Sequence, residues 1–162
     1  MKITLIAVGK MKERYFADAA TEYFSRIKNY AETELIELTD ESVKDKPSAS
    51  EIEIAKNKEG ERIKQRLAHP SLAKAYIVAL TPGGQQFSSE GLAEFMQNLA
   101  DNARRVVFII GGTYGISAEI LNLCHTKLSF SKMTFPHRLF RVMLLEQVFR
   151  ACKINRNEPY HK

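Results

Sequence analysis

Three short loops, rich in glycine and small polar residues, have the residue types and spacing that suit ligand binding. They cover residues 80–84, 111–115 and 129–137, and each directly follows a predicted strand. Glycine lets backbone approach a ligand closely, and exposed amides there can bind adenine, ribose or carboxylate without side chains. A glycine cluster is explained equally well by a tight turn from strand to helix. Each loop alone is therefore weak evidence for a site.

The third loop favours a nucleoside over a bare phosphate. It mixes small polar residues with apolar ones, in the order Ser129, Phe130, Ser131, Met133, Thr134 and Phe135. Such a lining supplies both hydrogen bonds and apolar contact. The phosphate-binding pattern GxxxxGK[ST] is absent. The glycines follow the fourth predicted strand, whereas dinucleotide-binding folds place them after the first, so those folds are disfavoured.

Positive charge gathers at the C-terminal end of the chain. Residues 127–162 hold eight Lys or Arg against two acids, a surplus of six, whereas the net charge of all 162 residues is +5. A basic end on an otherwise slightly acidic protein suits a polyanion, because neutralised phosphates release their condensed counterions. The expected partner is RNA, DNA or a phosphorylated ligand, although some basic tails serve only solubility.

Apolar periodicity predicts alternating strands and helices. Strands are expected at residues 3–8, 33–39, 75–80, 105–110 and 127–130, the third of them stopping at the sequence Thr-Pro-Gly-Gly. Helices are expected at 12–30, 51–67, 117–123 and 137–153, with another beginning after Ser88 as N-cap. Residues 40–50 read as a surface loop. This order implies an α/β fold with a mostly parallel sheet and helices on both faces, forming one domain over residues 1–162.

The remaining composition argues against a metal site and a membrane protein. Cys124 and Cys152 lack the paired spacing of a zinc or redox motif, and the four histidines are scattered, so no metal is predicted. No stretch approaches eighteen apolar residues, and the N-terminal apolar run is too short for a signal peptide. We therefore expect a cytoplasmic protein.

Specific motifs lie in the last sixty residues: FIIGGxxG at 108–115, LSFSKMTFPH at 128–137, Arg141-Val142, EQVFRA at 146–151 and the terminal PYHK. Further motifs along the chain are IAVGK at 6–10, Glu22-Tyr23, Lys58-Glu59-Gly60 and SSEGL at 88–92. Together these motifs resemble the ribosomal large-subunit RNA methyltransferase H family, which belongs to the SPOUT class.

The resemblance implies a trefoil knot in the C-terminal half, a homodimer, and methyl transfer from S-adenosyl-L-methionine to N3 of a pseudouridine in 23S ribosomal RNA. It also implies that the three loops bind the methyl donor. The positions carried over are Leu80, Gly111 or Gly112, Ser131, Lys132, Met133, Thr134, Phe135 and Pro136. These coincide with the loops that the residues themselves single out.

Methyl transfer from a sulfonium needs alignment and removal of the nucleophile's proton, and it needs no metal. The groups at hand are Arg141, Arg150, Tyr160, His161 and Lys162, of which Arg150, Tyr160 and His161 are our catalytic candidates. His161 is the candidate base because the ordinary pKa of histidine lies nearest neutrality. Without the resemblance, a histidine one residue from the C-terminus is explained equally well as a disordered surface group. Arg150 also has Glu146 one helical turn away as a ready ion-pair partner.

Three basic residues are candidates for RNA phosphates: Arg138, Arg141 and Lys162. Salt bridges are an alternative for the two arginines. Two rival functions stay open at this point. One is a noncatalytic RNA-binding ribosome factor, and the other is a nucleotide-binding α/β protein without chemistry.

Overall fold

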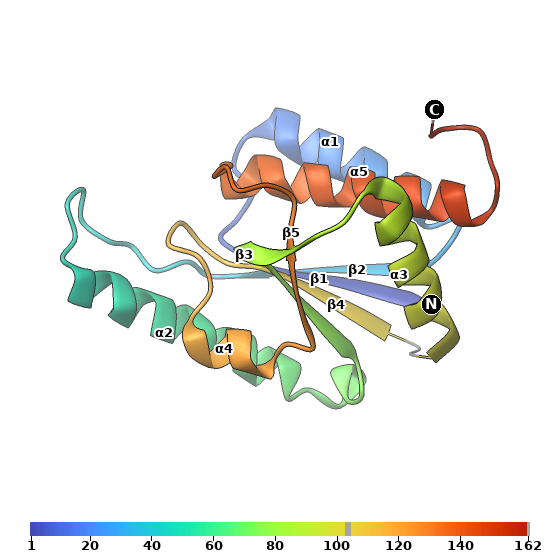
Figure 1. Cartoon of the computed structure of the whole chain (residues 1–162). Coiled ribbons are helices and arrows are strands. Elements are labelled where there is room, and N and C mark those ends of the chain that lie inside the picture. The colour runs from blue at the N-terminus through green and yellow to red at the C-terminus, as the bar shows by residue number, and fades with distance from the viewer. Residues whose placement is uncertain (103–104, 162) are drawn as a thin grey trace.

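A five-stranded parallel sheet forms the centre of the computed structural model, which describes residues 1–102 and 105–161 (Figure 1). The strands are β1 (Lys2–Val8), β2 (Glu32–Leu38), β3 (Tyr76–Gln86), β4 (Arg105–Ile110) and β5 (Thr126–Ser129). Their order across the sheet is β2-β1-β4-β3-β5, and every neighbouring pair is parallel. The predicted parallel α/β fold is confirmed; the knot stays a prediction.

Helices cover both faces of this sheet. The helices are α1 (Arg14–Ile27), α2 (Ala49–Leu67), α3 (Ser89–Asn102), α4 (Ala118–Leu123) and α5 (His137–Asn155), with a short 3₁₀ turn η1 (Pro70–Leu72). On one face α5 packs against both α1 and α3. On the other face lie α2 and α4, as Figure 1 shows. Strands parallel to one another need such crossovers, and the helices then bury both sides of the sheet.

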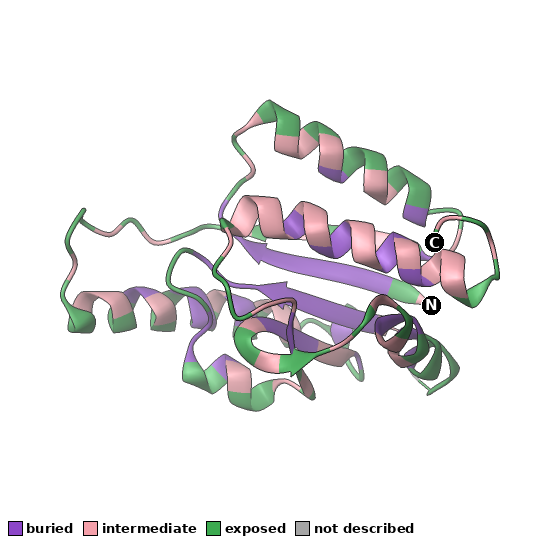
Figure 2. Ribbon diagram, turned by 45° about the horizontal axis from the view of Figure 1, so that its top comes forward, coloured by how far each residue is buried: buried purple, intermediate pink, exposed green. Residues whose placement is uncertain are grey.

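The alternation of side chains along β1 explains why its sequence is a continuous apolar run. Ile3, Leu5 and Ala7 belong to the core shared with α1, α3 and α5. Ile6 and Val8 belong to the core under α2 and α4. Successive strand residues point to opposite faces, so a strand covered on both sides has no polar face. Figure 2 shows this strand buried between the two helical layers.

One strand runs further than the sequence predicts. β3 does not stop at Leu80 but continues through the Thr-Pro-Gly-Gly segment to Gln86, with a register shift between Leu80 and Gln85. β5 pairs with β3 on both sides of this irregularity. At Gly84 any Cβ would lie 2.7 Å from the backbone nitrogen of Leu128, so only glycine allows this approach. The Thr-Pro-Gly-Gly residues therefore form an irregularity within β3 and do not end the strand.

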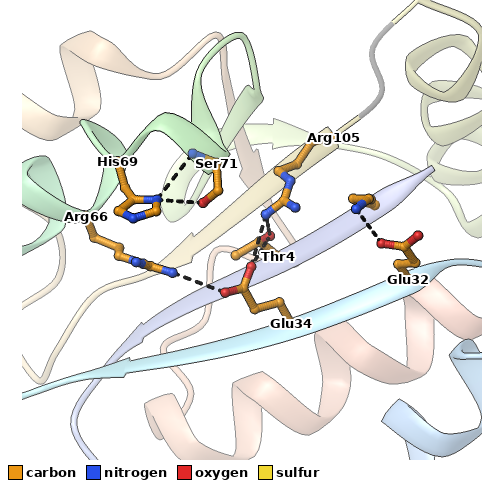
Figure 3. Close-up of polar contacts among 8 residues, drawn as sticks. Thr4, Glu32, Glu34, Arg66, His69, Ser71 and Arg105 are labelled. Carbon is orange, nitrogen blue, oxygen red and sulfur yellow. Dashed lines mark hydrogen bonds and ion pairs between the residues drawn. The ribbon is translucent and has the colours of Figure 1, made fainter.

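Basic residues on the α2 side are bound within the fold. Glu34 on β2 accepts from Arg66 at 3.1 Å and from Arg105 at 3.0 Å, and Arg105 also donates to the buried Thr4 at 3.1 Å (Figure 3). This network joins the C-terminal end of α2 to three strands. Some basic residues of this chain are therefore engaged in contacts within the fold and do not contribute to a surface that binds polyanions.

Gly60 lies in the middle of α2, where glycine ordinarily weakens a helix, yet the helix continues unbroken to Leu67. A Cβ at Gly60 would lie 2.5 Å from Oγ and 3.3 Å from Cβ of Ser117, the N-cap residue of α4. The missing side chain thus allows α2 and α4 to pack closely at the loop that follows β4.

We predict that Gly60→Ala destabilises the protein by about 1–3 kcal/mol, because the added methyl group overpacks this contact and displaces the Ser117 cap. In an open helix the same change usually stabilises by about 0.5–1 kcal/mol. Gly91→Ala in α3 is the control, since its Cβ would meet nothing closer than 3.5 Å. Urea unfolding measures both. A Gly60→Ala variant as stable as the unaltered chain would contradict the close packing.

Candidate functional site

The three loops that the sequence singles out meet in one cavity, beyond the carboxyl ends of β4 and β5 and beside β3. The cavity measures about 370 Å³. Its walls are residues from the β3 segment after Leu80, the glycine loop 110–116, the loop 129–135, and the start of α5. Ligands of α/β folds bind at this edge, and the volume falls within the usual range for small-molecule sites.

Most of the predicted cofactor positions line this cavity. They are Leu80, Gly111, Gly112, Ser131, Met133, Thr134 and Phe135. Lys132 and Pro136 belong to the same loop but are not among the lining residues, and both are exposed. The structure thus brings the predicted positions together, and their binding role stays a prediction.

Hydrogen bonds within the loops fix the shape of the cavity. Gly115 has φ of +86° and its N–H donates to the Gly112 carbonyl at 3.1 Å, which closes a tight turn. In the third loop Ser129 Oγ donates to the Ser131 carbonyl at 2.9 Å, and Ser131 Oγ accepts from Met133 N–H at 3.0 Å. A residue with positive φ in such a turn is most easily glycine.

Phe140 completes an aromatic wall of which the sequence analysis named only Phe130 and Phe135. Phe140 on α5 stacks on Phe135 with ring centroids 6.3 Å apart and meets Phe130 edge-on at 4.9 Å. All three rings line the cavity. A signal was present for Phe140, because it lies one helical turn after the third loop, but helical spacing alone assigns such a residue to the core.

His137 is a second lining residue that the sequence reasoning named only as the end of a loop. It begins α5 and lies close to Gly9 and Asp40. Burial lowers the pKa of His137, and the positive charges of Arg141 and Arg138 lower it further. His137 is therefore favoured as a neutral imidazole, which offers the cavity one donor and one acceptor.

Arg141 corrects a prediction made from the sequence. Only 1% of its side chain is exposed; it forms an ion pair with Glu37 at 2.9 Å and donates to the carbonyl oxygens of Val8 at 2.7 Å and Gly9 at 2.6 Å. A guanidinium so enclosed is not available to RNA phosphates. Its role is structural, because it holds the start of α5 against the end of β1.

The other two RNA candidates have different outcomes. Arg138 forms an ion pair with Glu13 but keeps 24% of its side chain exposed, so a phosphate contact stays a prediction for it. Lys162 lies outside the described residues.

The three predicted catalytic residues form one cluster at the far end of α5. Arg150 pairs with Glu146 at 2.6 Å, Tyr160 OH donates to the same Glu146 at 3.1 Å, and the Tyr160 ring lies under the Arg150 guanidinium. His161 Nε2 is 2.7 Å from a Glu90 carboxylate oxygen, and its Nδ1 is 3.3 Å from Arg150 Nη1.

Electrostatics in this cluster favour an ionised Glu90 and a protonated Tyr160. The pKa of Tyr160 rises to about 12, mainly because of burial, so this side chain acts as a hydrogen-bond donor near neutral pH. The pKa of Glu90 falls to about 2, first through a backbone hydrogen bond and then through His161. Glu90 is thus an acceptor that fixes the orientation of the imidazole.

The catalytic cluster and the cavity are not adjacent within one chain. His137 lines the cavity and Arg150 belongs to the cluster, and thirteen residues of helix at ~1.5 Å each separate them by about 20 Å. A second cavity of about 560 Å³ lies between them, sharing Ser129 and Phe130 with the first and reaching Glu146.

Metal and membrane features are absent from the described part of the chain. Within residues 1–102 and 105–161 no three His, Cys, Asp or Glu side chains form a group that could hold a metal ion. Cys124 and Cys152 are free thiols whose pKa burial raises to about 11. None of the helices described is both long and apolar enough to cross a membrane.

The sequence of this chain is similar to the sequences of known methyltransferases. The sequence model of a family described as "Predicted SPOUT methyltransferase" matches residues 1–161. "Ribosomal RNA large subunit methyltransferase H" of Clostridium acetobutylicum is 47% identical, with full coverage of both chains, and the protein of that name from Bacillus cytotoxicus is 44% identical with the same coverage. A solved structure of a probable methyltransferase from Bordetella pertussis has a TM-score of 0.54 at 15% identity, covering 93% of each chain, which supports the fold alone.

Proposed function

We propose a function for this chain from the family to which it belongs, the SPOUT methyltransferases. The protein methylates N3 of a pseudouridine in 23S ribosomal RNA on the assembled ribosome. The observation that carries the proposal is the convergence of three chain segments, each following a different strand, on one cavity. Full-length relatives at 44–47% identity bear a ribosomal RNA methyltransferase name, and this supports the substrate class. A protein that modifies ribosomes is expected in the cytoplasm.

The methyl donor that we propose is S-adenosyl-L-methionine, which supplies an electrophilic methyl group on a sulfonium. The cavity suits it: Gly111 and Gly112 offer backbone, Ser131 and Thr134 offer small polar groups, and the wall of Phe135 and its aromatic neighbours offers apolar contact. Lys132 and Pro136 would shape this loop from outside the cavity. Such a lining suits an adenosine moiety. It does not require a buried Lys or Arg side chain of the kind that binds phosphate.

The tail cluster suits the acid–base part of the reaction. An acceptor at Glu90 requires a proton on Nε2 of His161, which leaves Nδ1 as the basic nitrogen. In the free protein Nδ1 accepts a hydrogen bond from Arg150 Nη1 at 3.3 Å. We propose that the N3–H of the target base takes the place of this donor and passes its proton to Nδ1, while the released Arg150 guanidinium stabilises the resulting anion. Tyr160 donates a hydrogen bond and holds the cluster in place.

The proposed activity is tested by incubating ribosomes that lack the modification with the protein and labelled S-adenosyl-L-methionine. We expect label in a single pseudouridine of 23S ribosomal RNA, located by mass spectrometry of nuclease fragments. RNA binding without label in any ribosomal RNA would favour a noncatalytic ribosome factor instead. Binding of ATP or NAD with no response to the methyl donor would favour a nucleotide-binding protein without chemistry.

For the tail, we predict that His161→Asn slows methyl transfer by roughly 10²-fold, the usual contribution of a positioned acid–base group. The affinity for S-adenosyl-L-methionine should stay within about twofold, because the tail lies away from the cavity. Single-turnover methylation and calorimetry measure the two quantities. His69→Asn is the control, an exposed histidine that caps η1, as asparagine also can. Near-normal rates in His161→Asn would remove the histidine from the mechanism.

We also propose a homodimer in which the tail of one copy completes the cavity of the other. The separation of about 20 Å along α5 supports this arrangement, because it places the tail cluster at the far end of the helix from the cavity of the same chain. A closed dimer with two-fold symmetry would form two such composite sites.

Sedimentation should give a particle of about twice 18.4 kDa. Mixing two inactive variants tests the sharing of sites. Gly112→Val disables the cavity, since even a Cβ there would lie 2.7 Å from a Glu59 oxygen, and His161→Asn disables the tail. Refolding the two variants together should restore methylation, because mixed dimers contain one site with both parts intact. A stable monomer, or no recovery in verified mixed dimers, would contradict the arrangement.

A further inference from the structure

A buried carboxylate lies directly behind the glycine loop of the cavity. Glu59 on α2 is only 7% exposed. A Cβ built on Gly112 would lie 2.7 Å from Glu59 Oε2 and 2.9 Å from Oε1, so the carboxylate touches the face of Gly112 that is turned away from the cavity. Gly112 itself lines the cavity. A single residue of backbone therefore separates the carboxylate from any ligand.

The fold holds Glu59 in this place through a specific contact. Its neighbour Gly60 has no side chain, and this lets α2 approach Ser117 at the end of the glycine loop. Glu59 Oε1 accepts a hydrogen bond from the backbone N–H of Glu41 at 2.9 Å. The carboxylate thus links the loop after β2 to the loop after β4.

Glu59 has no ion-pair partner among the described residues, although the more distant charge of Arg62 and the N–H of Glu41 partly favour its ionised form. The adjacent Arg62 forms its ion pair with Glu41, and among the described residues no Lys, Arg or His nitrogen lies within 4.0 Å of the Glu59 carboxylate. Burial raises the pKa of Glu59, and the negative charge of Asp40 contributes in the same direction. A buried charge without a partner costs free energy.

A loop-supporting role alone does not explain a carboxylate here. The hydrogen bond from Glu41 needs only an acceptor oxygen, which a glutamine side chain supplies without the cost of burying a charge. The negative charge therefore calls for a use of its own. The nearest candidate is a ligand in the cavity on the other side of Gly112.

We propose that Glu59 is a positioning residue whose negative charge, acting across Gly112, makes the cavity prefer the cationic methyl donor to its neutral by-product. The inference rests on the proposed function. S-adenosyl-L-methionine and S-adenosyl-L-homocysteine share their adenosine, amino and carboxylate groups, and differ by the methyl group and the positive charge on sulfur. The difference between their binding free energies therefore reports on the methyl group and the charge on sulfur, because the contributions of the shared groups are the same in both.

Such a preference serves the reaction cycle. When the methyl group leaves sulfur for N3 of the base, the S–CH₃ bond breaks, its electron pair stays on sulfur, and the cation becomes a neutral thioether. The attraction exerted by Glu59 then disappears, which favours release of the by-product and binding of fresh donor. Charge interactions across a protein interior are strong enough for this, since the effective dielectric constant is well below that of water.

The test compares calorimetric affinities for both ligands in the unaltered chain, in Glu59→Gln and in Glu61→Gln. Glu61 lies on the same helix and is exposed, so it controls for loss of one negative charge. We expect the ratio of the dissociation constant of the by-product to that of the donor to fall about tenfold in Glu59→Gln, the scale of one charge interaction through protein. The ratio should stay unchanged in Glu61→Gln.

Equal weakening of both ligands in Glu59→Gln would overturn the inference, since it would mean that Glu59 only supports the loop. If the unaltered chain binds neither ligand, the proposed function fails as well, and this result is distinct from the first. Urea unfolding without ligand adds a readout that is independent of binding. Glu59→Gln should be at least as stable as the unaltered chain near neutral pH, because the raised pKa means that ionisation of Glu59 opposes folding there.

If Glu59→Gln does not fold, the same ratio is measured in the unaltered chain as the pH falls. Protonation of Glu59 should lower the ratio as the pH falls through its raised pKa. The groups facing Glu59 are Asp40, Glu41 and Arg62, and the glycine loop adds no acidic or basic side chain. His137 in the cavity also titrates, so His137→Gln is measured in parallel. A fall that persists in His137→Gln supports the inference, and a fall that vanishes there overturns it.

Discussion

The buried guanidinium of Arg141 is the contact on which the arrangement of the site depends. It reaches from α5 to the carbonyl oxygens of Val8 and Gly9 at the end of β1, and to the carboxylate of Glu37 at the edge of β2. A planar cation with five donors can satisfy two carbonyls and a carboxylate at once, which an ammonium group does less well. Burial opposes the charge, as the lowered pKa of Arg141 indicates, but the anion of Glu37 offsets that cost. The start of α5 is thereby fixed over the sheet, and with it the loop before α5 that forms one wall of the cavity.

Close approaches at two glycines supply the other constraint. At Gly84 the irregular part of β3 touches the backbone of β5, and at Gly60 α2 touches the side chain of Ser117, which caps α4. A Cβ would collide with backbone at Gly84 and would displace the Ser117 side chain at Gly60, and both contacts lie behind loops that line the cavity. The first carries the chain from Leu80 onward past the mouth of the cavity, and the second brings α2 to the glycine loop. Small residues at such crossings allow three loops of different origin to share one small volume, at the cost of a helix and a strand weakened by glycine.

The sequence is sufficient to predict the elements whose signals are local. The strand at residues 105–110 is predicted with the observed bounds of β4, and α5 differs from its prediction only at its end. The prediction fails where partners lie far apart in the chain. Sequence patterns assign the Thr-Pro-Gly-Gly segment to a turn, because nothing local reveals that β5 continues to pair with it. Arg141 is basic and lies near the C-terminus, so composition suggests a phosphate contact, whereas its partner Glu37 is 104 residues away. The three loops could be grouped in advance because parallel strands place their carboxyl ends at one edge.

The two buried charges near the cavity differ in a way that bears on function. Arg141 forms an ion pair with Glu37 and donates hydrogen bonds to two carbonyl oxygens, so its charge is satisfied within the fold. Glu59 accepts one backbone hydrogen bond and has no ion-pair partner among the described residues. Evolution can remove an uncompensated buried carboxylate with a single change to glutamine, which would relieve the desolvation cost while keeping the acceptor. A site that binds a cation is the setting in which that cost is offset only when ligand is present. A carboxylate that destabilises the free protein then strengthens the binding of a cationic ligand. Residues that bind ligand in this way are found at positions where they weaken the fold.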